Sequence, residues 1–185
     1  LDRDFVARTR PALEKHPLLG PEILALVKEG VDAADVARAV SQEQAEGLYH
    51  LGQLVGYVKR AHDVDANLSA HVMLENLASK ASGVLALRHL LHVSGEAPEA
   101  IEYVIECSEE ACGDMNQRGG GNMAKAAAEV AGLKNANGSD VRGFCAAPSH
   151  ALVVAASLVK AGTFKKVAVI SGGCTAKLGM NGKDH

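Results

Sequence analysis

The sequence has few aromatic residues and no tryptophan. Only three Phe and three Tyr occur among 185 residues, although 48% of the chain is hydrophobic. The core must therefore be aliphatic and rich in alanine, a composition that suits close packing of helices on a sheet. At this length the chain can bury a real core, and we expect one domain or most of one.

Other absences exclude whole classes of protein. A formal charge of −3 gives no electrostatic case for binding nucleic acid or an anionic membrane. No apolar run approaches the ~20 residues of a membrane span, and no signal peptide opens the chain. Because the chain also begins without methionine, we expect a piece of a longer protein.

Cysteine is scarce as well. The four cysteines are too few and too unevenly spaced for a disulfide scaffold, and they form no CxxC pair. They are Cys107, Cys112, Cys145 and Cys174. A reducing compartment fits these cysteines best, so we expect a cytoplasmic protein. From the charge and the lack of long apolar runs, we expect neither a membrane partner nor a nucleic-acid partner.

Signatures of nucleotide and metal sites are also missing. Three glycines at 119–121 precede a predicted helix and could cradle a phosphate. Neither GxxxxGK[ST] nor GxGxxG occurs, however, so a glycine loop without a ligand is the better interpretation. His89 and His92 lie three residues apart with no further ligand type beside them, and we interpret them as structural. We expect no cofactor and no metal.

The hydrophobic pattern predicts a helical leader followed by a longer α/β region. Residues 1–46 are predicted to form short helices, and 47–185 a second region that opens with a hairpin or two short strands over 48–58. Helices and buried strands then alternate over 68–173. The predicted elements are a helix 67–93, a strand 101–107, a helix 122–131, a turn 135–138, a strand 141–145, a helix 151–159 and a strand 167–173. This alternation predicts a three-layer α/β/α fold with a mostly parallel sheet.

One cysteine stands where the predicted strand 141–145 turns into a helix. Pro148 is accepted in the first turn of that helix, whose free N–H groups and partial positive charge stabilise a thiolate. Cys145 would lie at the carboxyl end of its strand, where open α/β sheets hold their ligands. This is the geometry of a nucleophile. The alternative, which is commoner for a free cysteine, is a buried cysteine in a turn of small residues.

Longer stretches of the chain carry a resemblance to known families. The segment from Phe144-Cys145-Ala-Ala-Pro-Ser-His to Val-Ala-Val-Ile-Ser-Gly-Gly173 resembles the N-terminal half of thiolase-fold condensing enzymes, especially the β-ketoacyl-acyl carrier protein synthase III type. Residues 105–122, Ile-Glu-Cys-Ser-Glu-Glu-Ala-Cys-Gly-Asp-Met-Asn-Gln-Arg-Gly-Gly-Gly-Asn, and 173–185, Gly-Cys-Thr-Ala-Lys-Leu-Gly-Met-Asn-Gly-Lys-Asp-His, resemble the beta subunit of component C of the glycine/sarcosine/betaine reductase complex. The likeness extends over essentially the whole chain.

The resemblance implies a thiolase-like half-domain without its C-terminal half, acting in acyl transfer. In the resembling complex of anaerobic metabolism, component C accepts a two-carbon unit from a selenoprotein and releases it to phosphate as acetyl phosphate. Cys145 matches the superfamily's nucleophilic cysteine and would carry the acyl thioester. The implied partners are the other subunit of component C, the selenoprotein and phosphate, within a homodimer or hetero-oligomer.

The resemblance also implies contacts around that cysteine. Asp114, Asn116 and Arg118, in the loop after the strand 101–107, would bind substrate or approach a neighbouring subunit, as would Ser149 and His150. The superfamily's His and its Asn or second His, which polarise the thioester, belong to the missing half. His150 is a poor substitute because it lies five residues after Cys145, about 140° around the helix.

Two other functions remain open. One is a non-catalytic assembly subunit that keeps the thiolase fold to dock its partners. The other is a condensing enzyme of the β-ketoacyl synthase III type, which the acidic loop 108–114 disfavours because it suits neither an apolar acyl tunnel nor an acidic carrier protein.

Overall fold

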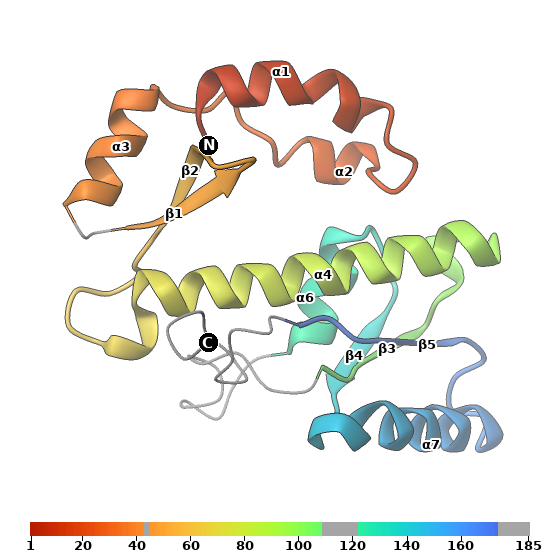
Figure 1. The fold of residues 1–185 in the computed structure, drawn as a ribbon. Coiled ribbons are helices and arrows are strands. Elements are labelled where there is room, and N and C mark those ends of the chain that lie inside the picture. Colours follow the sequence, from red (N-terminus) through yellow and green to blue (C-terminus); the bar gives the residue numbers. More distant parts are fainter. Residues whose placement is uncertain (43–44, 109–121, 174–185) are drawn as a thin grey trace. The chain divides into compact units, whose positions relative to one another are not determined.

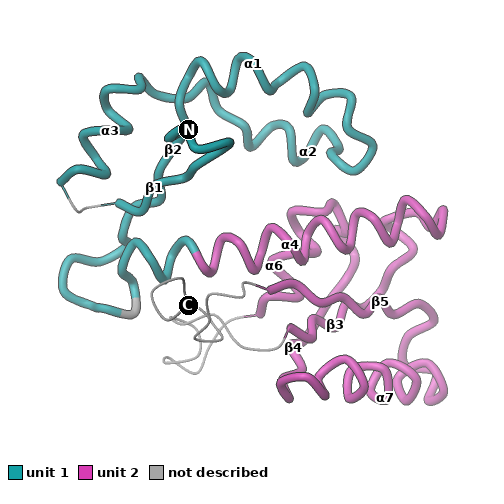
Figure 2. Tube along the Cα trace, viewed as in Figure 1, with its two compact units in different colours: residues 1–74 teal, residues 75–185 magenta. Residues whose placement is uncertain are grey.

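The computed structural model of the chain describes residues 1–42, 45–108 and 122–173 (Figure 1). The chain forms two compact units, Leu1–Leu74 and Glu75–His185 (Figure 2). The sequence-based boundary lies between residues 46 and 47, inside the first strand of the hairpin, which begins at Ala45. The structural division falls later because the hairpin packs against the third of the preceding helices and so belongs with them.

Unit 1 contains the predicted short helices and the predicted hairpin. Its elements are α1 (Arg3–Glu14), α2 (Pro21–Leu24), α3 (Ala33–Ser41), β1 (Ala45–His50), β2 (Gln53–Lys59) and the 3-10 helix η1 (Ala66–Leu68). β1 and β2 pair antiparallel across a two-residue turn. Leu51 and Gly52 in that turn have φ of 50° and 77°, and two consecutive positive φ values match the right-handed twist of a hairpin.

Unit 2 is built on a parallel sheet, as the alternating pattern predicted. β3 (Tyr103–Glu106) lies in the centre, with β4 (Asn137–Asp140) on one side and β5 (Val167–Ile170) on the other. Both neighbours run parallel to β3, and Ile105 is level with Ser139 and Val169. The fold class of the described region is therefore α/β, as expected.

Helices cover both faces of this sheet (Figure 1). α7 (Ala147–Lys160) packs on β3 and β5 through Ala147, Ala151 and Ala155, which meet Ile105 and Cys107. The opposite face carries α6 (Met123–Val130), which packs on β3 and β4, and α4 (Ala70–Ser94). The described part of unit 2 thus has three layers, and alanine in the interface lets α7 approach the strands closely.

The predicted position of one strand was wrong. Residues 135–138 were expected to turn and 141–145 to form a strand, but the strand is Asn137–Asp140 and residues Phe144–Ala146 form a 3-10 turn. The hydrophobicity pattern does not reveal β4, because this strand lies at one edge of the described sheet and is only half-buried. One further ladder bond, from Val141 N–H to the carbonyl of Glu106 (2.8 Å), ends the pairing.

Candidate functional site at the carboxyl edge of the sheet

Cys145 lies in the 3-10 turn η3 (Phe144–Ala146), which leads directly into α7. Its side chain is exposed. The turn is closed by two backbone hydrogen bonds, from Ala146 N–H to Gly143 O (3.0 Å) and from Ala147 N–H to Phe144 O. Pro148 occupies the first turn of the helix, as predicted. The cysteine is therefore accessible at the start of a 14-residue helix, where the partial positive charge of the helix dipole favours negative charge.

The residue before the cysteine has a strained backbone. Phe144 adopts a φ of 49°, in the left-handed region, which costs a residue other than glycine roughly 1–2 kcal/mol. Phe144 is 70% exposed, so burial of its side chain does little to offset that cost. Such a conformation persists only where the surrounding structure enforces it.

A buried ionic network lies on the strand ends beside this turn. Glu106, the last residue of β3, is 1% exposed. Its carboxylate accepts a hydrogen bond from Arg142 Nη1 (2.5 Å), and the same nitrogen donates to the backbone carbonyl of Glu106 (3.2 Å). Arg142 Nη2 donates to Asp140 Oδ2 (3.1 Å). One guanidinium therefore joins the ends of β3 and β4.

The network extends to β5 and to α6. Glu106 Oε1 also accepts from the backbone N–H and the hydroxyl of Ser108 and from Gly172 N–H, which follows β5. Asp140 accepts from the N–H groups of Met123 and Ala124 in the first turn of α6, each at 2.9 Å. A carboxylate at that position satisfies two unpaired helix donors and favours the positive end of the helix dipole. All three strands of the described sheet in unit 2 thus end at this network, and α6 begins at it.

The second described cysteine has a different environment. Cys107 is buried, and its thiol donates to the carbonyl of Ile170 (3.2 Å). Burial raises the pKa of Cys107, the negative charge of Glu106 raises it further, and Arg142 partly offsets the two. Its thiolate is therefore scarce near neutral pH, which makes Cys107 a poor nucleophile beside the exposed Cys145.

The other predicted site residues divide into two groups. Ser149 and His150 are exposed in the first turn of α7. The ring of His150 folds over Gly143, where an added Cβ would lie only 2.9 Å from Nδ1. Asp114, Asn116 and Arg118 lie outside the described residues, so their predicted contacts are not placed.

Sequence reasoning missed Glu106, Asp140 and Arg142. Two signals were available: a glutamate inside an apolar strand, and an arginine with an aspartate two residues before it near the next strand of the sheet. A buried charge is almost always paired, so Glu106 required a cation on a neighbouring element.

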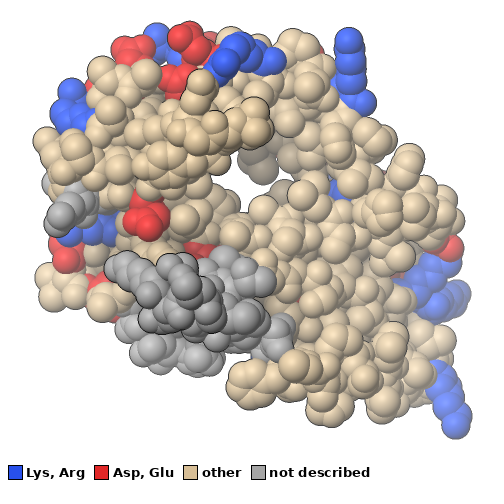
Figure 3. All heavy atoms as spheres, viewed as in Figure 1, with Lys and Arg blue, Asp and Glu red and all other residues tan. Residues whose placement is uncertain are grey.

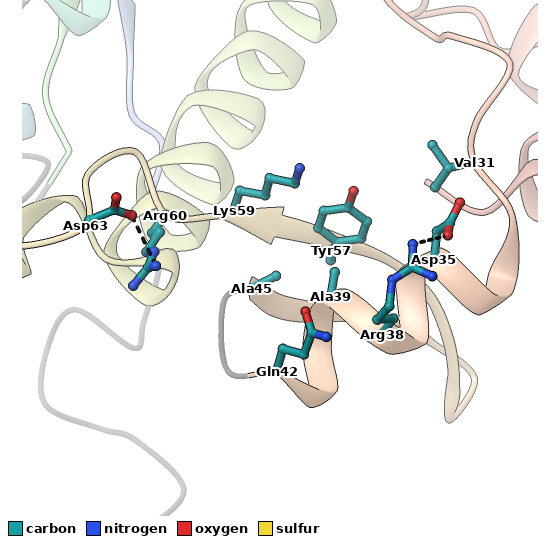
Figure 4. Close-up of a pocket in the computed structure, with 10 residues that line it drawn as sticks. All are labelled: Val31, Asp35, Arg38, Ala39, Gln42, Ala45, Tyr57, Lys59, Arg60 and Asp63. Carbon is teal, nitrogen blue, oxygen red and sulfur yellow. Dashed lines mark hydrogen bonds and ion pairs between the residues drawn. The ribbon is translucent and has the colours of Figure 1, made fainter.

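Unit 1 contains a separate cavity of about 490 Å³ between α3 and the hairpin (Figure 4). Its charged side chains are largely paired with one another, Arg38 with Asp35 (2.5 Å) and Arg60 with Asp63 (3.1 Å). Among the described residues that line it there is neither a cysteine nor a histidine. The cavity therefore lacks an exposed cysteine like the one at the edge of the sheet in unit 2.

Within the part of the chain that the structure describes, no group of three His, Cys, Asp or Glu side chains could hold a metal ion. No helix in the described ranges has both the length and the apolar character needed to cross a membrane.

The outer face of α7 is apolar and exposed. Leu152, Val153 and Val159 are 61%, 66% and 46% exposed, and Lys160 is the only charged residue of the helix. Over this helix, Figure 3 shows positive charge only toward its C-terminal end. Cys145 thus lies just before a helix whose exposed face is apolar, as is typical of a surface that contacts another protein segment.

Comparison with known proteins agrees with the resemblance found in the sequence. No protein-family profile matches the chain. The chain is 58% identical, over all of its length, to the glycine/sarcosine/betaine reductase complex component C subunit beta of Peptoclostridium acidaminophilum, and it spans 36% of that protein. The predicted resemblance is therefore confirmed, as a similarity to about a third of a longer chain.

A solved structure, the priming β-ketosynthase from the R1128 polyketide biosynthetic pathway, is similar over 65% of this chain and 30% of its own. The TM-score is 0.42 and the sequence identity 24%.

Proposed function

We propose that this chain is part of a component C subunit of a glycine/sarcosine/betaine reductase complex, and that Cys145 carries an acyl group there as a thioester. The observation that supports this most strongly is the combination of 58% identity over the full length with an exposed cysteine at the start of α7. An accessible thiol at the positive end of a helix dipole suits nucleophilic catalysis.

The proposed reaction has two acyl transfers. In the first, the Cys145 thiolate attacks the carbonyl carbon of a two-carbon acyl group, a C–S bond forms, and the carrier selenoprotein leaves with the electron pair of the broken bond. In the second, an oxygen of phosphate attacks the thioester carbon, acetyl phosphate forms, and Cys145 leaves as the thiolate. The same helix N-terminus that stabilises the attacking thiolate also stabilises it as a leaving group.

The proposed partners follow from the same similarity. They are the other subunit of component C, the selenoprotein and phosphate, in the cytoplasm. The exposed apolar face of α7 would be covered in the longer chain or the assembled complex. Asp114, Asn116 and Arg118 are proposed to contact substrate or a neighbouring subunit, and β4 to pair with a second copy, since its outer edge has no strand beside it among the described residues.

The test is substitution of Cys145 by alanine in the full-length subunit, assembled with its complex. Acetyl phosphate formation should fall at least a hundredfold, because the covalent route is lost. The matched control is Cys107→Ala, which removes a buried thiol from the same unit and should retain most of the activity. Unchanged activity of the Cys145→Ala complex would instead support a non-catalytic assembly subunit.

A further inference from the structure

We propose that Arg142 is a positioning residue for Cys145: by bridging Glu106 and Asp140, it enforces the strained turn at Phe144 on which the cysteine is presented. The placement of the turn follows from the geometry of its two ends. Its consequence for catalysis rests on the proposed role of Cys145 as nucleophile.

The first anchor of the turn is the guanidinium of Arg142. It makes hydrogen bonds to the carboxylates of Glu106 and Asp140 and to the backbone carbonyl of Glu106. The side chain is 25% exposed and faces a carboxylate that is 1% exposed, so water screens the pair only weakly. Two nitrogens of one planar group are engaged, which fixes the direction of the side chain as well as its distance.

The second anchor is the start of α7. Ala147 and Ala151 are both fully buried, and they pack against Ile105 and Cys107 on the face of the sheet. Because these contacts are made by methyl groups close to the helix backbone, α7 has little freedom to shift. The helix and the strand end at Arg142 are therefore held independently.

Only four residues, 143–146, connect the two anchors. The ring of His150 packs against Gly143 and Ala146 N–H bonds back to the carbonyl of Gly143, so the change of chain direction falls on Phe144 with its φ of 49°. If the first anchor loosens, the backbone of Phe144 can relax toward negative φ. Cys145, the next residue, then leaves its position at the helix N-terminus.

Lysine cannot replace arginine in this role. Its ammonium keeps the charge opposite Glu106, but it has no planar fork to hold two carboxylates in one orientation. Arg142→Lys therefore separates the anchoring function from the charge.

The experiment measures alkylation of each cysteine by iodoacetamide at fixed pH, using the full chain and peptide mass spectrometry. Arg142→Lys is expected to lower the Cys145 rate at least fivefold and to leave Cys107 protected. Arg88→Lys is the matched control: Arg88 donates to the carbonyl of Ala131 (3.1 Å) between α4 and α6, away from the turn. It should change the Cys145 rate less than twofold.

A second substitution tests the link to strain. Asparagine tolerates the left-handed region, so in a Phe144→Asn background Arg142→Lys should lower the Cys145 rate less than twofold. An undiminished effect in that background, or an unchanged Cys145 rate in Arg142→Lys with Cys107 still protected, would overturn the proposal.

If Arg142→Lys exposes Cys107, the unit has opened and Asp140→Asn decides instead. That variant removes one of the two carboxylates that Arg142 bridges and keeps the pair with Glu106. The proposal is supported if Cys145 is alkylated two- to threefold more slowly while Cys107 stays protected. An unchanged rate would overturn the proposal. Alkylation involves no acyl chemistry, so failure of the proposed function, an absent acyl adduct, would leave this result intact.

Discussion

Replacing Arg142 by methionine should strongly destabilise unit 2. The substitution removes the cation that faces Glu106 and leaves a carboxylate with 1% exposure. Breaking a buried ion pair from one side costs about 3–5 kcal/mol. Because Ser108 and Gly172 still donate hydrogen bonds to Glu106, the lower end of that range, about 3 kcal/mol, is the expected loss.

Cys107 provides the assay, because it is buried in the core of the same unit. Its alkylation under native conditions requires the unit to open, so the labelling rate reports the opening equilibrium. Each 1.36 kcal/mol is a factor of ten, and a loss of about 3 kcal/mol therefore raises the Cys107 rate about 150-fold. Peptide mapping separates this site from the other cysteines.

The matched control removes both charges. In Glu106→Gln/Arg142→Met the carboxylate with 1% exposure is gone, and Asp140, which is 16% exposed, keeps its hydrogen bonds from Met123 and Ala124 N–H. Cys107 labelling should therefore rise no more than about tenfold over wild type, because replacing both partners of a buried pair is often nearly neutral. The reasoning is refuted if Arg142→Met raises the rate less than about fivefold, or if the double variant labels as fast as Arg142→Met.

Three further predictions concern unit 2. Burial and Glu106 raise the pKa of Cys107, so the stability that its thiol contributes is complete below the ordinary thiol pKa and is lost as pH rises through the raised value. Between pH 8 and pH 10, the free energy of unfolding in urea should therefore fall more in wild type than in Cys107→Ala. Equal decreases in the two proteins would contradict this. Gly138→Ala should lower the free energy of unfolding by about 1–3 kcal/mol in thermal unfolding, because the added Cβ would lie 2.8 Å from Val104 O and 2.9 Å from Ala124 Cβ. A Cβ added at Gly173 has no atom within 4 Å, so Gly173→Ala should change stability little. Asn122 caps α6 by accepting from Lys125 N–H (2.8 Å), and its Nδ2 donates to Gly138 O (2.7 Å). Asn122→Ala should therefore lose about 1–2 kcal/mol in urea unfolding, and Asn122→Ser, which can keep the cap but not the bond to Gly138, should lose less.

Much of the fold could be predicted because helices and buried strands carry strong periodic signals. Val84, Leu87 and Leu91 line the buried face of α4 at three- and four-residue steps, and the apolar strands β3 and β5 were placed within a few residues. β4 was misplaced because its residues, Asn-Gly-Ser-Asp, are typical of a turn. Its strand conformation is set by pairing with β3, which is information that no local pattern contains.

The candidate site was predicted only in part. Cys145 was predicted from a local succession of strand, cysteine and helix, although the strand in fact ends at Asp140 and the cysteine lies in a 3-10 turn. The network of Glu106, Asp140 and Arg142 joins residues up to 36 positions apart in the chain, and only the sheet topology brings them together. The strain at Phe144 results from two anchors acting on one short segment, so it too depends on tertiary structure.

The most direct test of the acyl-transfer proposal is mass spectrometry of the full-length subunit after incubation with its acyl donor and without phosphate. The proposal predicts an acetyl adduct on the tryptic peptide that contains Cys145, lost when phosphate is added. No adduct on that peptide, or an adduct on another cysteine of the subunit, would contradict it.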